Sequence, residues 1–94
     1  MSSLEGKIVL ITGASSGIGA GTAKHLASLK CRLALVGRNQ ESLNTVANEC
    51  REKGAIEVLE VVKDLMSADA CREVVNITVT HFKGNLTAVH NSKF

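Results

Sequence analysis

Residues 7–19 read Lys7-Ile8-Val9-Leu10-Ile11-Thr12-Gly13-Ala14-Ser15-Ser16-Gly17-Ile18-Gly19, which is a short apolar run followed by a glycine-rich turn. The apolar run, Lys7–Thr12, is rich in β-branched residues, as is typical of a strand buried on both faces of a parallel sheet. Beyond the turn, apolar residues recur at helical spacing at Ile18, Leu26 and Leu29, with Thr22 between them. These residues therefore predict a strand, a tight turn and a helix, in that order.

The rest of the sequence repeats this alternation of strand and helix signals. Further apolar runs predict strands at residues 32–36, 56–62 and 86–90. Because strands that alternate with helices form right-handed βαβ units, we expect a parallel sheet with strand order 3-2-1-4. Of its three helices, the first two should lie on one face and the third on the other. This α/β arrangement is the opening part of a doubly wound Rossmann sheet, with residues 1–94 in a single domain.

The second and third helices have recognisable ends. Asn39 and Ser67 are residue types that cap helix N-termini, and Gly54 and Gly84 are expected to end the two helices. Each helix should bury one apolar stripe against the sheet. The expected stripes are Leu43, Val46, Ala47 and Cys50 in the second helix, and Cys71, Val74, Val75, Thr78 and Phe82 in the third.

Length and composition exclude several classes of function. The 94 residues suffice for one small domain, and 45% hydrophobic with 21% charged residues is typical of a globular protein. A net charge of +2, without a run of five like charges, gives no basis for binding nucleic acid or an anionic membrane. No apolar stretch approaches the about 20 residues of a membrane span, and no secretory signal is visible. We therefore expect a cytoplasmic protein.

The cysteine and aromatic content limits the chemistry further. Cys31, Cys50 and Cys71 are widely spaced and form no C-x-x-C pair, so we expect small buried or half-buried thiols and no metal site. The chain has no tyrosine and no tryptophan, and its only aromatic residues are Phe82 and Phe94. A mechanism that needs a phenol therefore cannot be supplied by these residues.

The turn at Gly13–Gly19 has the context of a phosphate-binding loop, because it follows a strand and opens a helix. Glycine lets backbone N–H groups approach an anion closely, and the helix N-terminus adds a partial positive charge. The spacing is G-x-x-x-G-x-G. We interpret this turn as the site of a dinucleotide pyrophosphate, against the alternative of a purely structural turn.

Two other motifs overlap the same residues. Gly13–Gly17 also fits the G-x-S-x-G nucleophile elbow, for which Asp64 and a downstream histidine, His81 or His90, would complete a triad. An elbow on the first strand leaves little preceding chain for an oxyanion hole, so we do not favour it. A P-loop needs Lys followed by Ser or Thr after its last glycine, where this chain has Ala20.

The end of the second predicted strand indicates which dinucleotide would bind. An NAD site has an acidic residue there that accepts hydrogen bonds from the ribose 2′-OH. This chain instead has Gly37-Arg38-Asn39, and a guanidinium binds a 2′-phosphate through paired N–H donors. The sequence thus favours NADP over NAD, with a solvated surface arginine as the alternative. After the third strand, Asp64 either begins the next helical connection or accepts a hydrogen bond from the adenine amino group.

Together, Thr12–Gly19, Gly37–Asn39 and Asp64-Leu65 resemble the N-terminal part of the short-chain dehydrogenases/reductases. The resemblance runs from Gly6 to Phe82. It implies a Rossmann fold that binds NAD(P), and hydride transfer between that cofactor and a carbonyl or alcohol substrate. It also implies two groups of cofactor contacts: Gly13, Ser15, Ser16, Gly17, Ile18 and Gly19 for pyrophosphate and ribose, and Arg38, Asn39, Asp64 and Leu65 for the 2′-phosphate and adenine.

The resemblance ends before the family's catalytic residues. The family's fourth strand ends in Asn-Asn-Ala-Gly; here Asn91 aligns with the first asparagine, and Ser92–Phe94 does not match. The family's catalytic serine and Tyr-x-x-x-Lys pair come later. We therefore expect a truncated NADP-binding portion of an oxidoreductase without catalytic residues or, alternatively, a non-catalytic dinucleotide-binding remnant. An unpaired outer edge of the fourth strand would favour self-association.

Overall fold

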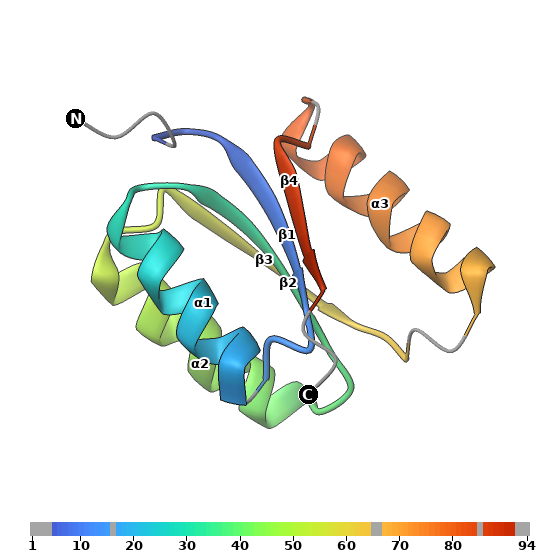
Figure 1. Ribbon diagram of the computed structural model, residues 1–94, viewed down its shortest axis with the longest axis horizontal. Coiled ribbons are helices and arrows are strands. Elements are labelled where there is room, and N and C mark those ends of the chain that lie inside the picture. The colour runs from blue at the N-terminus through green and yellow to red at the C-terminus, as the bar shows by residue number, and fades with distance from the viewer. Residues whose placement is uncertain (1–4, 16, 65–66, 85, 92–94) are drawn as a thin grey trace.

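The computed structural model describes residues 5–15, 17–64, 67–84 and 86–91. Its strands form one sheet in the order β3-β2-β1-β4, and every neighbouring pair is parallel. Helices α1 and α2 cover one face of this sheet, and α3 lies on the other (Figure 1). The predicted strand order and distribution of helices are confirmed. The elements are β1 (Ile8–Thr12), α1 (Gly17–Ser28), β2 (Arg32–Gly37), α2 (Gln40–Lys53), β3 (Glu57–Val62), α3 (Ala68–Phe82) and β4 (Ala88–Asn91).

The strand register brings the carboxyl ends of all four strands to one edge of the sheet. Thr12, at the end of β1, pairs with Val36 of β2 and with Asn91 of β4. Val36 in turn pairs with Val61 of β3. Because the strands are parallel, the turns that follow them leave the sheet side by side.

The residues that were predicted to cap and end α2 and α3 do so in the structure, with one exception. The Asn39 side chain accepts a hydrogen bond from the Ser42 amide at 2.9 Å, and Ser67 accepts one from the Ala70 amide at 3.2 Å. Gly54 ends α2 with φ of 120°. The residue that ends α3 in the left-handed conformation is Lys83, with φ of 54°, where Gly84 was expected.

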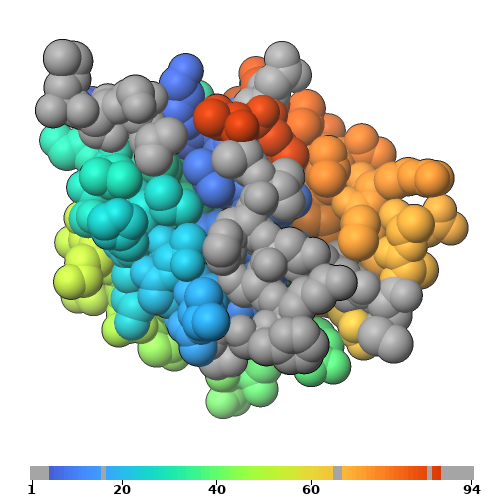
Figure 2. All heavy atoms as spheres, viewed as in Figure 1, coloured from blue at the N-terminus to red at the C-terminus, as the bar shows by residue number. Residues whose placement is uncertain are grey.

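The side chains of β1 and most of those of β2 are buried on both faces of the sheet, as the apolar runs predict. Ile11 and Leu35 belong to the core under α1 and α2, whereas Leu10 and Val36 belong to the core under α3. Figure 2 shows α1 and α3 on opposite sides of the molecule. The third strand begins at Glu57, one residue later than predicted, and Ile56 is 56% exposed.

The predicted apolar stripe of α1 is wrong at its start. Ile18 is 65% exposed, and Leu26 and Leu29 are only half-buried. Small residues form the buried face instead, and at Gly19 the adjacent backbone of Gly13 and Ala14 leaves no room for a side chain. The small buried residues are Gly19, Ala20, Ala23 and Ala27.

The predicted stripe of α3 is correct at Val74, Thr78 and Phe82, which are buried. Val75 is half-buried, and Cys71 is exposed, so its predicted burial is wrong. Among the described residues, α3 is the only helix on this face. A lone helix buries only the narrow stripe that faces the sheet, so a flanking position such as Cys71 stays in solvent.

No described helix is both long and apolar enough to cross a membrane.

Candidate functional site

The turns that follow β1, β2 and β3 are joined to one another by backbone hydrogen bonds. The Ala14 amide donates to the Val36 carbonyl at 3.0 Å, and the Lys63 amide donates to the Gly37 carbonyl at 2.9 Å. The first bond joins the glycine-rich turn to β2, and the second joins the turn after β3 to the same strand. The residues that the sequence singled out in these turns therefore share the carboxyl edge of the sheet.

The glycine-rich turn needs glycine for two distinct reasons. Gly13 and Gly17 have φ of 63° and 60°, a left-handed conformation that residues with a side chain rarely adopt. Gly19 is buried, and a Cβ atom there would lie 2.1 Å from the Gly13 carbonyl oxygen. The absence of a side chain thus lets the first turn of α1 pass directly against the turn that precedes it.

This close approach leaves the start of α1 at the surface. Gly13, Gly17 and Ile18 are exposed, and Ser15 is half-buried. The first turn of α1 contains no acidic residue that would offset the partial positive charge of the helix N-terminus. The arrangement suits an anion. Ser16, also predicted to contact the cofactor, lies outside the described residues.

Gly37 permits a second close contact, between the turn after β1 and the end of β2. It is buried, and a Cβ atom at Gly37 would lie 3.1 Å from the Cβ of Ser15 and 3.4 Å from Cδ1 of Leu43. In the sequence, Gly37 stands out only as the residue before Arg38. Its steric role could have been suspected from its place at the end of a buried strand, but the partner Ser15 could not.

Arg38 and Asn39 follow Gly37 and are both exposed. Arg38 forms no hydrogen bond or ion pair with any residue that the structure describes, so its guanidinium is available to a ligand. The Asn39 side-chain oxygen is already engaged as the cap of α2. The two neighbouring residues thus differ: the Asn39 side chain has a structural role, and the Arg38 side chain has no partner within the described part of the chain.

The turn after β3 carries Lys63 and Asp64. Asp64 is exposed, and the ammonium group of Lys63 forms an ion pair with Glu73 of α3. Leu65, the last of the predicted contacts, lies outside the described residues.

Asn91 reaches the same edge from β4, through its pairing with Thr12. Asn91 aligns with a family asparagine and is not among the predicted site residues.

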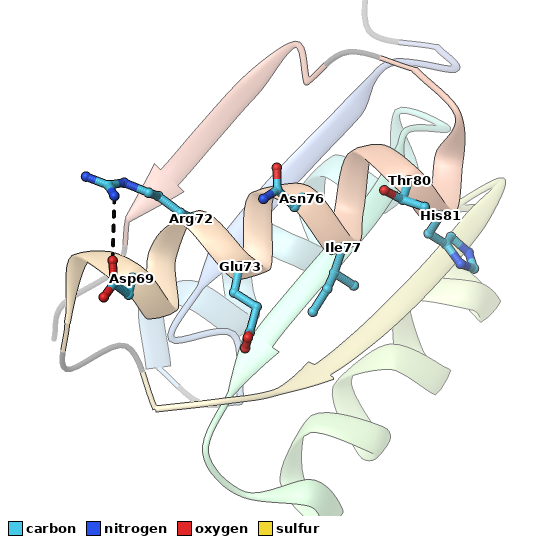
Figure 3. A pocket seen from close by; sticks show the side chains of 7 residues that line it. All are labelled: Asp69, Arg72, Glu73, Asn76, Ile77, Thr80 and His81. Atoms are coloured by element: carbon cyan, nitrogen blue, oxygen red, sulfur yellow. Dashed lines mark ion pairs between the residues drawn. The ribbon is translucent and has the colours of Figure 1, made fainter.

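A hollow lies on the outer surface of α3 (Figure 3), and through Glu73 its lining contacts Lys63 of the turn after β3. It is shallow, and an ion pair between Asp69 and Arg72 at 3.5 Å lies along it. None of the predicted cofactor contacts lines it. Its lining residues are Asp69, Arg72, Glu73, Asn76, Ile77, Thr80 and His81.

The described cysteines and acidic residues do not form a second kind of site. Within the described ranges, no cluster of three or more His, Cys, Asp or Glu side chains could hold a metal ion. Burial raises the pKa of the Cys31 thiol. Burial, assisted by the charge of Glu49, raises the pKa of Cys50 to about 11. Both thiols are thus poor nucleophiles near neutral pH, since the thiolate is the reactive form.

Comparisons with known proteins agree with this geometry. A family profile described as short chain dehydrogenase matches residues 7–92. The 11-beta-hydroxysteroid dehydrogenase 1A of Arabidopsis thaliana is 47% identical over 79 residues, which are 84% of this chain and 23% of that protein. The 11-beta-hydroxysteroid dehydrogenase B of Arachis hypogaea is 40% identical over 79 residues, or 22% of its length. The chain thus spans less than a quarter of these two relatives.

Solved structures show the same likeness. A short chain dehydrogenase of Mycobacterium thermoresistibile superposes with a TM-score of 0.86 and 34% identity, covering 96% of this chain and 34% of that one. An NADH-dependent reductase, A1-R′, crystallised with NAD, superposes with a TM-score of 0.84 and 28% identity over 94% of this chain and 36% of its own.

Proposed function

The chain belongs to the short-chain dehydrogenase family, and from that premise we propose that it binds NADP at the carboxyl edge of its sheet. The observation that carries the proposal is the contact between Gly19 and the Gly13 carbonyl, which leaves no room for a side chain. This contact holds the N-terminus of α1 open toward solvent, where backbone amides and the helix dipole favour a diphosphate. Membership of the family also implies a nicotinamide dinucleotide as the cofactor.

The residues of the glycine-rich turn would contact the pyrophosphate and the adjoining ribose. In this proposal Gly13, Gly17 and Gly19 shape the turn, and their backbone approaches the ligand. Ile18, which is exposed although it is apolar, would cover one side of the bound dinucleotide. Ser15 and Ser16 would add hydroxyl donors.

The preference for NADP over NAD rests on the end of β2. Gly37 closes that strand, no acidic side chain follows it, and Arg38 is exposed without a partner among the described residues. We propose that the Arg38 guanidinium binds the 2′-phosphate. Asn39 would act indirectly by capping α2, and Asp64 with Leu65 would border the adenine.

A titration that compares 2′,5′-ADP with 5′-AMP tests this assignment. We expect the full chain to bind 2′,5′-ADP about 10- to 100-fold more tightly, which is the range of a charge-assisted hydrogen-bonded contact. Arg38→Ala should remove most of that difference. Arg72→Ala, which removes an exposed arginine on α3, is the matched control and should leave both affinities unchanged.

Two outcomes would contradict the proposal. Equal affinity for the two nucleotides, unaltered by Arg38→Ala, would refute the preference for NADP. A folded chain that binds neither nucleotide would refute dinucleotide binding altogether.

Hydride transfer to or from a carbonyl or alcohol is the activity that we propose for the oxidoreductase to which this portion corresponds. The 94 residues contain no tyrosine, which in this family is the expected proton donor to the substrate oxygen. We therefore propose that these residues bind the cofactor without turnover. NADPH absorbance followed with a panel of aldehydes and ketones should show no consumption, and a substrate-dependent rate would refute this.

Self-association through β4 is a further part of the proposal. Among the described strands β4 pairs only with β1, so the N–H and C=O groups of its other edge can accept a second strand. We propose a second copy of the chain as the occupant. Light scattering after size-exclusion chromatography should show a dimer or larger species, and a monomer at high concentration would exclude it. We also propose a reducing, cytoplasmic environment, in which the three thiols would stay reduced.

A further inference from the structure

Helix α3 is attached to the β3 segment by two polar side-chain contacts, one Lys–Glu ion pair and one His–Glu contact. Near its start, Glu73 contacts the ammonium group of Lys63, directly after β3. Near its end, His81 Nε2 lies 2.6 Å from Oε2 of Glu57, the first residue of β3. Glu73 and His81 are both drawn on α3 in Figure 3. The two pairs thus anchor the same helix to opposite ends of the same strand.

The two pairs are similar in their exposure to solvent. The side chains of Lys63 and Glu73 are 32% and 53% exposed, and those of His81 and Glu57 are 38% and 51% exposed. They differ in their position relative to the candidate site. The β3 strand runs from Glu57 to Val62, roughly 17 Å at about 3.3 Å per residue, so the His81 pair lies at the far edge of the sheet.

Lys63 occupies the point where two proposed parts of the adenosine site meet. Its backbone amide donates to the Gly37 carbonyl at 2.9 Å, and Gly37 directly precedes Arg38. The next residue in the chain is Asp64. Any restraint on Lys63 therefore acts on the spacing between the turn that carries Arg38 and the turn that carries Asp64.

We infer that Glu73 is a positioning residue for the adenosine half of the bound dinucleotide. By holding the Lys63 ammonium group, it limits the motion of the turn after β3 and keeps Asp64 beside the end of β2. Glu73 itself touches no part of the ligand in this scheme. The inference rests on the proposed dinucleotide site, and it assigns to α3 a role at that site through one defined contact.

The effect of losing this restraint is expected to be modest. The pair is partly exposed, and exposed ion pairs have small measured effects, so we expect Glu73→Gln to weaken the binding of 5′-AMP about two- to fivefold. Inorganic pyrophosphate, which would occupy only the glycine-rich turn, should bind Glu73→Gln as it binds the unmodified chain. A general loss of structure would weaken both ligands.

His81→Gln provides the matched control, because it releases the other end of the same helix. Both variants should lower the urea midpoint of the full chain by similar amounts. Only Glu73→Gln should weaken 5′-AMP, as measured by isothermal titration calorimetry. The charge exchange of Lys63→Glu with Glu73→Lys rebuilds the pair in reverse and should recover at least half of the lost affinity.

Three outcomes would overturn the inference. Equal weakening of 5′-AMP by Glu73→Gln and His81→Gln would show that only the docking of α3 matters. Equal weakening of 5′-AMP and pyrophosphate by Glu73→Gln would show a general disturbance of the site. Failure of the unmodified, folded chain to bind 5′-AMP would refute the proposed function and this inference together, whereas the first two outcomes refute the inference alone.

Discussion

The two faces of the sheet are built by different means. On the face covered by α1 and α2, close backbone approaches accompany a large core of side chains: Gly19 passes against the Gly13 backbone, and Gly37 makes room for the Ser15 side chain. On the face covered by α3, a smaller core of side chains is accompanied by partly exposed polar contacts of Glu73 and His81. The comparison indicates that the glycine-rich turn is held rigidly by sterics, whereas the turn after β3 is held by weaker and adjustable interactions.

The largest effect is expected from Gly19→Ala, on the face with backbone contacts. The new Cβ would lie 2.1 Å from the Gly13 carbonyl oxygen, and neither backbone segment can yield without disturbing the turn. We expect a loss of about 3 kcal/mol in the free energy of unfolding, at the upper end of the usual cost of overpacking. Urea unfolding followed by circular dichroism measures this loss.

Gly21→Ala is the control for this substitution, because it adds the same methyl group to the same helix. Gly21 is exposed, and a Cβ there meets nothing within 4 Å. Alanine favours the helix over glycine, so stability should rise by about 0.5–1 kcal/mol. If both substitutions changed stability alike, α1 would not be in backbone contact with the turn, and the contrast between the two faces would fail.

The next largest effect is a pH dependence of the free energy of unfolding, which arises from the buried Cys50 thiol of α2. Burial raises the pKa of Cys50 to about 11 in the folded chain, from an ordinary value of 9.0. Between these two values the unfolded chain releases the thiol proton and the folded chain retains it, so stability falls as pH rises. At 1.36 kcal/mol per pH unit, the loss amounts to roughly 2–3 kcal/mol by pH 11.

Urea midpoints recorded from pH 8 to pH 11 under reducing conditions test this expectation. Cys50→Ala should flatten the decline, although burial also raises the pKa of Cys31 and leaves a residual slope of the same sign. Cys71→Ala is the control, since this exposed thiol lies on α3. If the urea midpoint fell as steeply with pH in Cys50→Ala as in the unmodified chain, a tightly packed core beneath α2 would be contradicted.

The sequence predicted the elements whose signals are local. The caps at Asn39 and Ser67 and the end of α2 at Gly54 follow from the chemistry of single residues. Strand order followed from the alternation of strands and helices together with right-handed crossovers. The glycines also predicted a tight turn after the first strand, where Gly13 and Gly17 have φ near 60°.

The features that could not be predicted depend on distances between elements. The helical spacing of Ile18, Leu26 and Leu29 did not identify the buried face of α1: Ile18 is exposed, and the buried residues are the small ones. Periodicity also placed Cys71 under α3, because it cannot show that a helix lacks a neighbour on its own face. The contact of Gly37 with Ser15 and the pairing of Lys63 with Glu73 join residues far apart in sequence, for which no local signal exists.

The smallest effects on stability are expected at the N-terminal caps of α2 and α3. These caps are equivalent and lie on opposite faces of the sheet, so they allow a direct comparison of the two faces. Asn39→Ala and Ser67→Ala each remove one side-chain hydrogen bond to a helix N-terminus, and each should cost about 1 kcal/mol. The two substitutions should differ in which amides exchange faster with solvent. Helix α2 packs against both α1 and the sheet, so its amides should exchange with solvent mainly through global unfolding.

Helix α3 is alone on its face among the described residues, so the loss of its cap should open it locally. Hydrogen exchange followed by mass spectrometry should therefore show faster exchange across Ala68–Phe82 in Ser67→Ala, with the β1 and β2 amides still protected. Asn39→Ala should instead reduce the protection of amides from hydrogen exchange evenly over both faces of the sheet. Ser67→Asp and Asn39→Asp keep an oxygen acceptor and should restore both patterns. If α2 and α3 responded alike to the loss of their caps, the two faces would be equally cohesive, and the adjustable character that we assign to the α3 side would be wrong.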